Sequence, residues 1–316
     1  MKLKHKFSTI VFTMLSLFVI TSCKEKKEVP VVEENEKVSQ NNYVEVITNS
    51  MDFEMVDEVK SGWTTFQYIN KSSETHFFIL EKMPDTLGLE TYKRDLFPPF
   101  TSAFEHFEKG EIEAGMKEFE KIPEWFSKVE LAGGVGLTSK KITSKSTIFL
   151  EPGTYVMECY VRMPNGMPHT FLGMVKELLV SEESNGKIAP EADYNIDIAS
   201  TKGITFIDSI KSGNYTFEVK FKDQKQYEHM MGHDVNLVKI DNDSLITNLG
   251  NWLNTMDFKA FRSPSPEGLL FLGGVEDLPS GNTGYFEVNL EKGSYVLISE
   301  IPNAIERKMI KAFKVY

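Results

Sequence analysis

An internal repeat constrains the fold of this 316-residue chain more than any other feature of its sequence. A shift of 140 positions aligns Gly133–Cys159 with Gly273–Ser299 without a gap. The residues of the first copy that recur in the second include Gly133, Gly134, Val135, Leu150, Glu151, Gly153, Tyr155 and Val156. Because self-similarity at a fixed shift is typical of duplicated structural units, we expect two related domains.

The similarity extends to the beginning of each half. The sequence VKSGWTTFQY at 59–68 is similar to IKSGNYTFEV at 210–219. We therefore place the first domain at 43–182 and the second at 193–316. The polar segment SEESNGKIAPEA at 181–192 contains glycine and proline and is typical of a linker.

Short segments of both halves alternate between apolar and polar residues with a period of two. In one such segment Thr64, Phe66 and Tyr68 would share one face of a strand. Turn residues separate these segments, which favours antiparallel sheets packed face to face. We predict an all-β fold of two tandem Greek-key β-sandwiches.

The first domain carries an insertion at about 86–127 with a helical pattern. Its apolar residues form two runs in which the spacing is three or four positions. The first run is Tyr92, Leu96, Phe100, Phe104 and Phe107, and the second is Ile112, Met116, Phe119 and Ile122. Because proline interrupts helices, we expect Pro98 and Pro99 to divide the first run into two helices. The apolar stripes would pack against their own domain or, alternatively, form a lid or docking surface.

The N-terminus is typical of an export signal. Lysines at positions 2, 4 and 6 precede the apolar run Ile10–Ile20. The sequence ITSC at 20–23 resembles the lipobox of bacterial lipoproteins. This resemblance implies that 1–22 is a signal peptide and that Cys23 is lipidated. The segment that follows is rich in charge and poor in apolar side chains, so we expect 23–42 to be a flexible tether.

A lipid on Cys23 would anchor the chain to a membrane of the cell envelope, at the periplasmic or surface-exposed face of the outer membrane. The alternative is a plain secretory peptide that contains a cysteine. The formal charge is −11, and removal of 1–22 makes it −14 because three lysines and no acid are lost. Such an acidic surface argues against nucleic acid as a partner.

Cys159 would be the single thiol of the mature chain, since the sequence has two cysteines. A lone thiol in an oxidising compartment is either buried as a small hydrophobe or held as a metal thiolate. In the expected strand, Tyr155, Met157, Cys159 and Val161 share one face. We therefore expect Cys159 to point inward.

The first domain resembles the cupredoxin family of blue-copper proteins in three segments. TTFQYINKSSETHFFIL resembles the strand that carries the first copper histidine, here His76. PGTYVMECYV resembles the strand that ends in the copper cysteine, here Cys159. PHTFLGMVKELLV resembles the closing loop and last strand, and supplies His169 and Met174.

This resemblance implies two cupredoxin-like sandwiches and one copper ion held by His76, Cys159 and His169, with Met174 as the weak axial ligand. It also implies electron transfer or copper handling beside a redox protein partner. Two features depart from the family: nine residues separate Cys159 from His169, and Phe77 follows His76. The alternative is a metal-free domain in which Cys159 is a core residue.

The second domain lacks this ligand set. Ser299 stands where Cys159 does, and no histidine lies between Ser299 and Met309. A possible second cluster for a soft metal is formed by His229, Met230, Met231 and His233. The alternative is that these side chains fill the rim of the sandwich.

Motifs of catalysis are missing from the sequence. It has no His-x-His pair for a catalytic copper centre, no Gly-x-Ser-x-Gly and no His-Glu-x-x-His. From this we predict a chain that is not an enzyme. The alternative to a copper protein is a metal-free surface lipoprotein whose sandwiches bind a protein or a glycan.

Overall fold

The computed structural model describes residues 42–316. The predicted signal peptide, the lipidation site Cys23 and the tether up to residue 41 lie outside the described residues. Within 42–316, no helix has both the length and the apolar character that crossing a membrane requires.

The first repeat is built mainly of strands. They are β1 (Val44–Thr48), β2 (Glu58–Asn70), β3 (His76–Lys82), β4 (Glu130–Thr138), β5 (Thr143–Leu150), β6 (Gly153–Glu158) and β7 (Val175–Ser184). Its helices are α1 (Leu89–Glu108) and α2 (Ile112–Glu118), with the short 3₁₀ helices η1 (Phe119–Lys121), η2 (Glu124–Lys128) and η3 (His169–Leu172).

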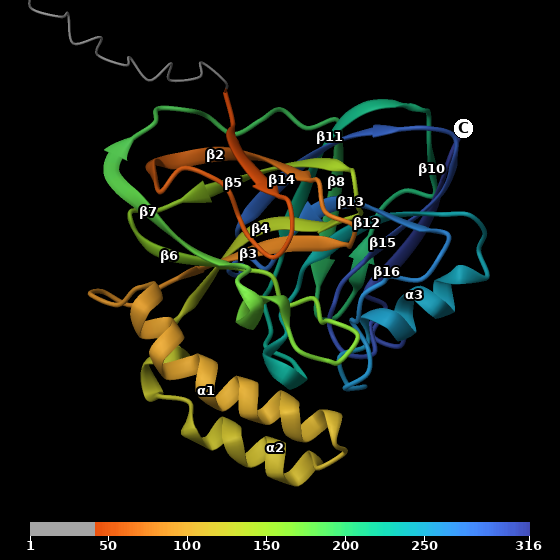
Figure 1. The fold of residues 1–316 in the computed structure, drawn as a ribbon. Helices are drawn as coiled ribbons and strands as arrows, with labels where there is room; N and C mark the ends of the chain where they lie inside the picture. The colour runs from red at the N-terminus through yellow and green to blue at the C-terminus, as the bar shows by residue number, and fades with distance from the viewer. Residues whose placement is uncertain (1–41) are drawn as a thin grey trace, which may run out of the picture. The chain divides into compact units, whose positions relative to one another are not determined.

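The second repeat has the same strand plan with two short strands added, β9 and β10, together with a single α-helix, α3 (Leu245–Leu253), and the 3₁₀ helix η4 (Glu228–Met230). Its strands are β8 (Tyr194–Ala199), β9 (Gly203–Thr205), β10 (Ser209–Ile210), β11 (Gly213–Phe221), β12 (Val235–Ile240), β13 (Leu269–Val275), β14 (Thr283–Leu290), β15 (Gly293–Ile298) and β16 (Ile310–Val315). The predicted all-β fold of two sandwiches with a helical insertion is confirmed (Figure 1).

Both sheets run through the two repeats without a break. In one sheet β4 pairs with β13, and in the other β5 pairs with β14, both antiparallel. Without the short edge strands β10, which pairs with β16, and β9, which pairs with β8, the strand orders are β7-β6-β3-β4-β13-β12-β15-β16 and β1-β2-β5-β14-β11-β8. If each strand is replaced by its equivalent in the other repeat, each order is simply reversed. An approximate two-fold axis therefore relates the repeats at the pairs β4–β13 and β5–β14.

The repeated Gly-Gly-Val motif is explained by close strand contacts. A Cβ atom on Gly134 would overlap the carbonyl oxygen of Phe78 in β3, and one on Gly274 would overlap that of Val235 in β12. This shared contact makes Phe78 and Val235 equivalent positions. His233 therefore stands in the second repeat where His76 stands in the first.

Replacing Gly134 by alanine should lower the stability of the fold. The new methyl group would push β4 away from β3, which costs about 2–3 kcal/mol or about 5 °C in melting temperature. Thermal unfolding followed by circular dichroism measures the change. Gly110→Ala is the control, because a Cβ there meets nothing within 4 Å and only its φ of +79° is unfavourable. Equal melting temperatures for Gly134→Ala and the wild type would contradict this account.

The helical insertion corrects one detail of the sequence prediction. Pro98 and Pro99 lie inside α1 and do not divide it. Each proline removes one backbone donor, but the buried face of α1 continues on both sides of the pair, with Leu96 at 1% and Ala103 at 0% exposure. Packing along this face therefore holds the two halves in one helix.

Helix α1 packs on the loop that follows β6. The ring of Phe171 in η3 lies 4.9 Å from Phe97, 5.8 Å from Phe100 and 6.3 Å from Phe104, measured between ring centroids. Figure 1 shows α1 and α2 together on one side of the sheets, next to this loop. The insertion therefore covers the segment that begins with His169.

Candidate metal centre

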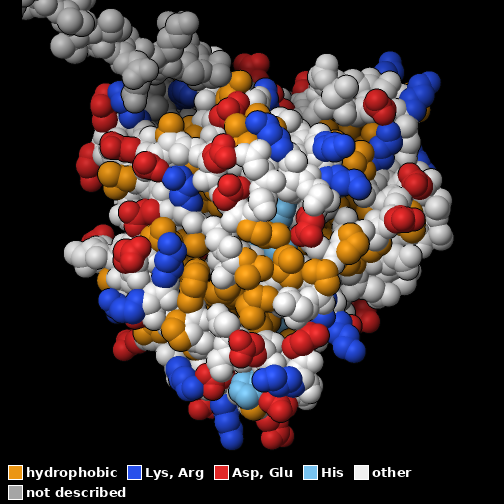
Figure 2. Space-filling view, in the orientation of Figure 1, with side chains coloured by type: hydrophobic (Ala, Val, Ile, Leu, Met, Phe, Trp, Pro, Cys, Tyr) orange, Lys and Arg blue, Asp and Glu red, His pale blue; other side chains and the backbone are white. Residues whose placement is uncertain are grey.

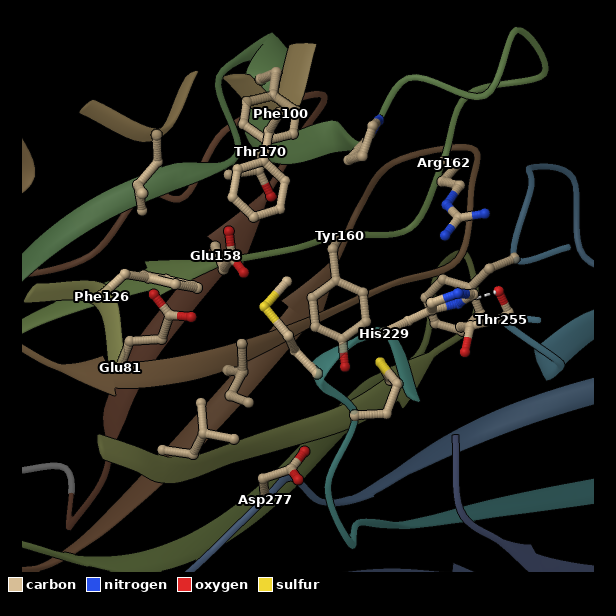
Figure 3. A pocket seen from close by; sticks show the side chains of 18 of the residues that line it. Glu81, Phe100, Phe126, Glu158, Tyr160, Arg162, Thr170, His229, Thr255 and Asp277 are labelled. Carbon is tan, nitrogen blue, oxygen red and sulfur yellow. Dashed lines mark hydrogen bonds between the residues drawn. The ribbon is translucent and has the colours of Figure 1, made fainter. Parts of the chain in front are cut away.

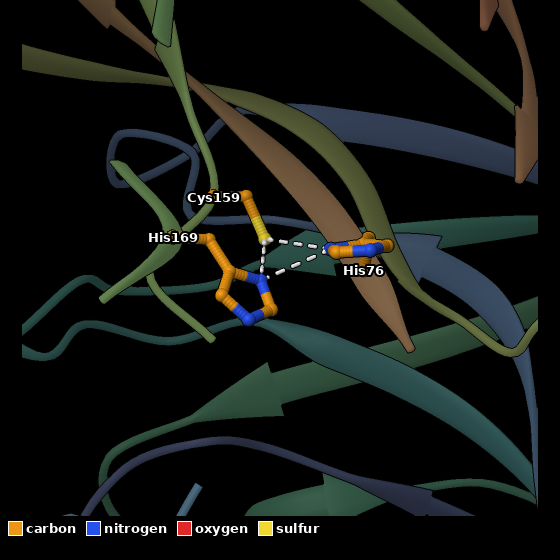
Figure 4. A group of neighbouring side chains, drawn as sticks. All are labelled: His76, Cys159 and His169. Atoms are coloured by element: carbon orange, nitrogen blue, oxygen red, sulfur yellow. Dashed lines mark hydrogen bonds between the residues drawn. The ribbon is translucent and has the colours of Figure 1, made fainter. Parts of the chain in front are cut away.

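Three predicted ligands converge in the first repeat. The Nδ1 atoms of His76 and His169 lie 3.1 Å apart, and the Cys159 Sγ lies 3.8 Å from the first and 3.9 Å from the second. Figure 4 shows the three side chains pointing toward one another from separate segments. All three are fully buried, at 0% exposure.

The ligand segments are fixed by the sheet and by short backbone bonds. His76 begins β3, and Cys159 follows the last residue of β6, the strand that pairs with β3. The N–H of His169 donates to the carbonyl of Val161 at 2.8 Å, which closes the loop between the two ligands. The long spacing between Cys159 and His169 is therefore compatible with a compact site.

Met174 lies beside the trio through its backbone. Its N–H donates to the carbonyl of His169 at 3.1 Å, and its carbonyl accepts from the N–H of Cys159 at 3.2 Å. The side chain is fully buried, at 0% exposure. This position agrees with the axial role that the resemblance implies.

Burial sets the protonation of the three donors. It lowers the pKa of His76 to about 4 and, together with the nearby His76, that of His169 to about 3. Burial also raises the pKa of the Cys159 thiol to about 12. At neutral pH both imidazoles therefore have a free lone pair, while the thiol keeps a proton that a metal must displace.

The donor set fits a small trigonal metal site. Bonds of about 2.0 Å to nitrogen and about 2.3 Å to sulfur at 120° place the two nitrogens about 3.5 Å apart and each nitrogen about 3.7 Å from the sulfur. The observed separations are 3.1, 3.8 and 3.9 Å. Two imidazoles and a thiolate with a nearby thioether are the ligands of blue copper, so the predicted copper site is supported by geometry.

In this assignment the outer nitrogens of the two imidazoles, the Nε2 atoms, would not bind the metal. Among the described residues, neither the Nε2 of His76 nor that of His169 has a hydrogen-bond partner, although both are buried. The nearest carboxylate to His169 is Glu74, whose Oε2 lies 3.4 Å from Nε2. A metal on Nδ1 would place the proton on Nε2, and Glu74 is in position to orient it.

Phe171 is expected to position His169. Phe171→Ala would remove the ring contacts to α1 and loosen η3, so we expect copper to dissociate about 10-fold faster or more, with a changed copper spectrum. Transfer of copper to a chelator, followed by stopped-flow absorption, measures the rate. Phe149→Ala is the control, since Phe149 is a 51% exposed aromatic residue of β5. Equal rates for both variants would contradict a positioning role.

The possible second cluster is not gathered in the same way. The Nε2 of His233 lies 3.0 Å from the Tyr227 hydroxyl and its Nδ1 lies 3.0 Å from the carbonyl of Asp223. The Nδ1 of His229 lies 2.8 Å from the carbonyl of Thr255. Three of the four ring nitrogens thus have protein partners. The soft-metal cluster of His229, Met230, Met231 and His233 stays a prediction.

A cavity of about 150 Å³ beside the metal centre was missed by sequence reasoning. It lies between α1 and the second repeat, and its lining includes Tyr160 and Thr170, the neighbours of Cys159 and His169 in sequence. Figure 3 shows Glu81 and Glu158 on one side of it and Arg162 on the other. Figure 2 shows hydrophobic side chains gathered on the face above the helical insertion.

The two glutamates of the cavity are held in a low-dielectric environment. Burial raises the pKa of both Glu81 and Glu158. The hydroxyl of Tyr92 in α1 donates to Glu158 at 2.9 Å. Nothing in their spacing, 77 residues apart with Tyr92 between them, marks the three residues as neighbours in the sequence.

No protein-family profile and no curated protein sequence matches the chain. Among solved structures, it is similar to reduced auracyanin from Roseiflexus castenholzii, with 14% identity, a TM-score of 0.30, and coverage of 40% of this chain and 99% of that one. It is also similar to a copper-containing nitrite reductase from Thermus scotoductus, with 11% identity, a TM-score of 0.22, and coverage of 87% and 61%. A blue copper oxidase from Nitrosomonas europaea matches with 9% identity, a TM-score of 0.20, and coverage of 85% and 76%.

These comparisons correct one prediction. The solved structures that cover most of the chain include a nitrite reductase and an oxidase, both copper enzymes. This finding contradicts the prediction, drawn from missing motifs, that the chain is not an enzyme. The tandem cupredoxin-like fold rests on the strand order and the ligand segments described above. At these TM-scores we infer no activity from the similarities.

Proposed function

We propose that this chain is a copper protein that transfers single electrons through a centre formed by His76, Cys159, His169 and Met174. The observation that carries the proposal is the convergence of two buried imidazole Nδ1 atoms on the only thiol of the described residues. Copper bound by such ligands changes its charge by one electron with little rearrangement, because soft sulfur donors and imidazoles serve both oxidation states.

The protein's own groups would perform three tasks. The neutral imidazoles are ready to bind, because their pKa values lie near 4 and 3. Burial keeps water away from all three donor atoms, which limits solvent reorganisation during electron transfer. The strand pair β3–β6 holds His76 and Cys159 in fixed register.

Metal analysis tests this proposal directly. The full chain loaded with Cu(II) and then passed over a desalting column should retain one copper per chain. His169→Gln should retain much less, and His106→Gln, which changes a partly exposed histidine of α1, should retain one. Retention that is equal in all three proteins would contradict the proposal.

We also propose that the protein is a lipoprotein of the cell envelope that exchanges electrons with a redox protein. The lipobox-like sequence that ends at Cys23 supports the anchor, and the acidic chain disfavours nucleic acid. A Cys23→Ser variant should not incorporate labelled fatty acid and should leave the membrane fraction. Incorporation that persists in this variant would contradict the anchor.

Oxidation of a small molecule is a second candidate function, and the cavity beside Tyr160 favours it. A small aromatic reductant would fit the aromatic walls and lie next to the residue that follows Cys159. With hydroquinone as the probe, the rate of Cu(II) reduction should saturate as its concentration rises. A rate that stays proportional to concentration would show that the cavity does not bind the reductant.

A further inference from the structure

A buried acidic cluster lies in the second repeat. It consists of Asp234 just before β12, Glu276 just after β13 and Glu300 after β15. One carboxylate oxygen of each residue lies within 4.8 Å of those of the other two. The exposure of these residues is 1%, 0% and 0%.

The hydrogen bonds in this cluster are unevenly distributed. Asp234 accepts bonds from the Ser299 hydroxyl at 2.6 Å and from the N–H of Glu300 at 2.7 Å. The side-chain amide of Asn236 donates to Asp234 at 2.7 Å and to Glu300 at 3.1 Å. By contrast, both carboxylate oxygens of Glu276 are buried without a hydrogen-bond partner among the described residues.

No basic side chain balances these charges. Among residues 42–316, no lysine, arginine or histidine forms a salt bridge with any of the three carboxylates. Buried and unpaired carboxylates are costly, and burial raises the pKa of Glu276 and of Glu300 well above the ordinary value. A bound cation would remove this cost by giving the free oxygens of Glu276 a partner.

We propose that Asp234, Glu276 and Glu300 bind a hard divalent cation such as calcium. The candidate ligands are all oxygens, which hard cations prefer over softer metals. The three oxygens lie no more than 4.8 Å from one another, and oxygens on opposite sides of a calcium ion are about 4.6–5.2 Å apart, so a single ion could contact all three. The ion would be held by carboxylates from three segments that the sheet brings together.

The cluster lies beside the second repeat's counterpart of the metal centre, because Asp234, Glu276 and Glu300 align with Phe77, Gly136 and Tyr160 and not with the copper ligands. Ser299 aligns with Cys159, and its hydroxyl bonds Asp234 where the first repeat has a thiol among imidazoles. The two regions touch through one hydrogen bond, in which the Tyr160 hydroxyl donates to Glu300 at 2.9 Å.

Thermal unfolding of the full chain tests the proposal. After treatment with a chelator, 1 mM CaCl₂ should raise the melting temperature of the wild type by about 5 °C or more. Glu276→Gln keeps the size of the side chain but loses the charge, so its calcium response should disappear. Glu267→Gln, at an exposed position of the same repeat, should respond like the wild type.

Direct observation of the ion makes the test independent of how Glu276→Gln folds. Manganese is the probe: Mn²⁺ added to the wild type should lose its free-ion electron paramagnetic resonance signal, and crystals should show an anomalous peak among the three carboxylates. No thermal response to calcium together with no bound Mn²⁺, or an anomalous peak elsewhere, overturns the proposal. Calcium binding should persist in Cys159→Ser, so failure of the copper site and failure of this site are distinguishable.

Discussion

Replacing Cys159 by serine should abolish the intense visible absorption of the copper-loaded chain and weaken copper binding by about 100-fold or more. The absorption arises from charge transfer between thiolate sulfur and Cu(II), and a serine hydroxyl is a hard donor that keeps its proton. Because Cys159 is 0% exposed and serine has almost the same size, the loss would come from chemistry more than from packing.

Visible and electron paramagnetic resonance spectra of the full chain, titrated with Cu(II), measure this effect. His106→Gln provides a matched control, since His106 lies on α1 and is not one of the buried trio. Its Nδ1 pairs with the Glu111 carboxylate at a distance of 2.6 Å. Circular dichroism should show that Cys159→Ser is folded. A copper spectrum that is the same in the wild type and in Cys159→Ser would exclude the thiolate centre and favour a metal-free binding module.

Acidification should destabilise the copper-free protein through its two buried histidines. Their folded-state pKa values, about 4 for His76 and about 3 for His169, lie below the ordinary value of 6.5. The unfolded chain therefore binds more protons between these values, so the histidines' contribution to stability is fully present above pH ~6.5 and is lost as the pH falls toward 4 and 3. The loss should amount to several kcal/mol, because one pKa unit corresponds to about 1.4 kcal/mol.

Buried carboxyl groups act in the opposite direction and must be separated from this effect. Burial raises the pKa of Glu81, Glu158 and Glu276, so their contribution favours the folded state at low pH and is lost as the pH rises. Urea unfolding between pH 7 and pH 4 should be compared for the copper-free wild type and for His76→Gln with His169→Gln. The double variant keeps the carboxyl contribution, so it should lose several kcal/mol less on acidification. An equal loss of unfolding free energy in both proteins between pH 7 and pH 4 would show that burial does not lower the pKa values of His76 and His169.

The sequence was sufficient to predict the three converging ligands, because chemistry restricts them to rare residue types in a fixed order. Cys159 is the single thiol of the described residues, and His76 and His169 lie on the segments that resemble the ligand-bearing strand and loop. The continuous helix through Pro98 and Pro99 could not be predicted in this way. Local propensity disfavours it, and the packing that offsets this penalty comes from distant residues such as Phe171.

The acidic cluster and the cavity could not be predicted from the sequence for a related reason. Asp234, Glu276 and Glu300 follow no motif, and only the pairing of β12 with both β13 and β15 brings them together. The pairing of β4 with β13 could not be predicted from the sequence either, because the pattern of each strand does not indicate a partner in the other repeat. Contacts between repeats depend on the complete surface of each one, which a local pattern does not contain.

The shared sheets imply that neither half of this chain is an independent folding unit. Separation near residue 190 would strip the hydrogen-bonded neighbour from β4 and β5 and leave their backbone groups open to other chains. Isolated halves would aggregate or pair with their own copies, whereas the intact chain would unfold in one cooperative transition. Evolution of the second repeat is thereby constrained: although it lacks the cysteine and histidines of the metal centre, it must keep the strands that complete the first half.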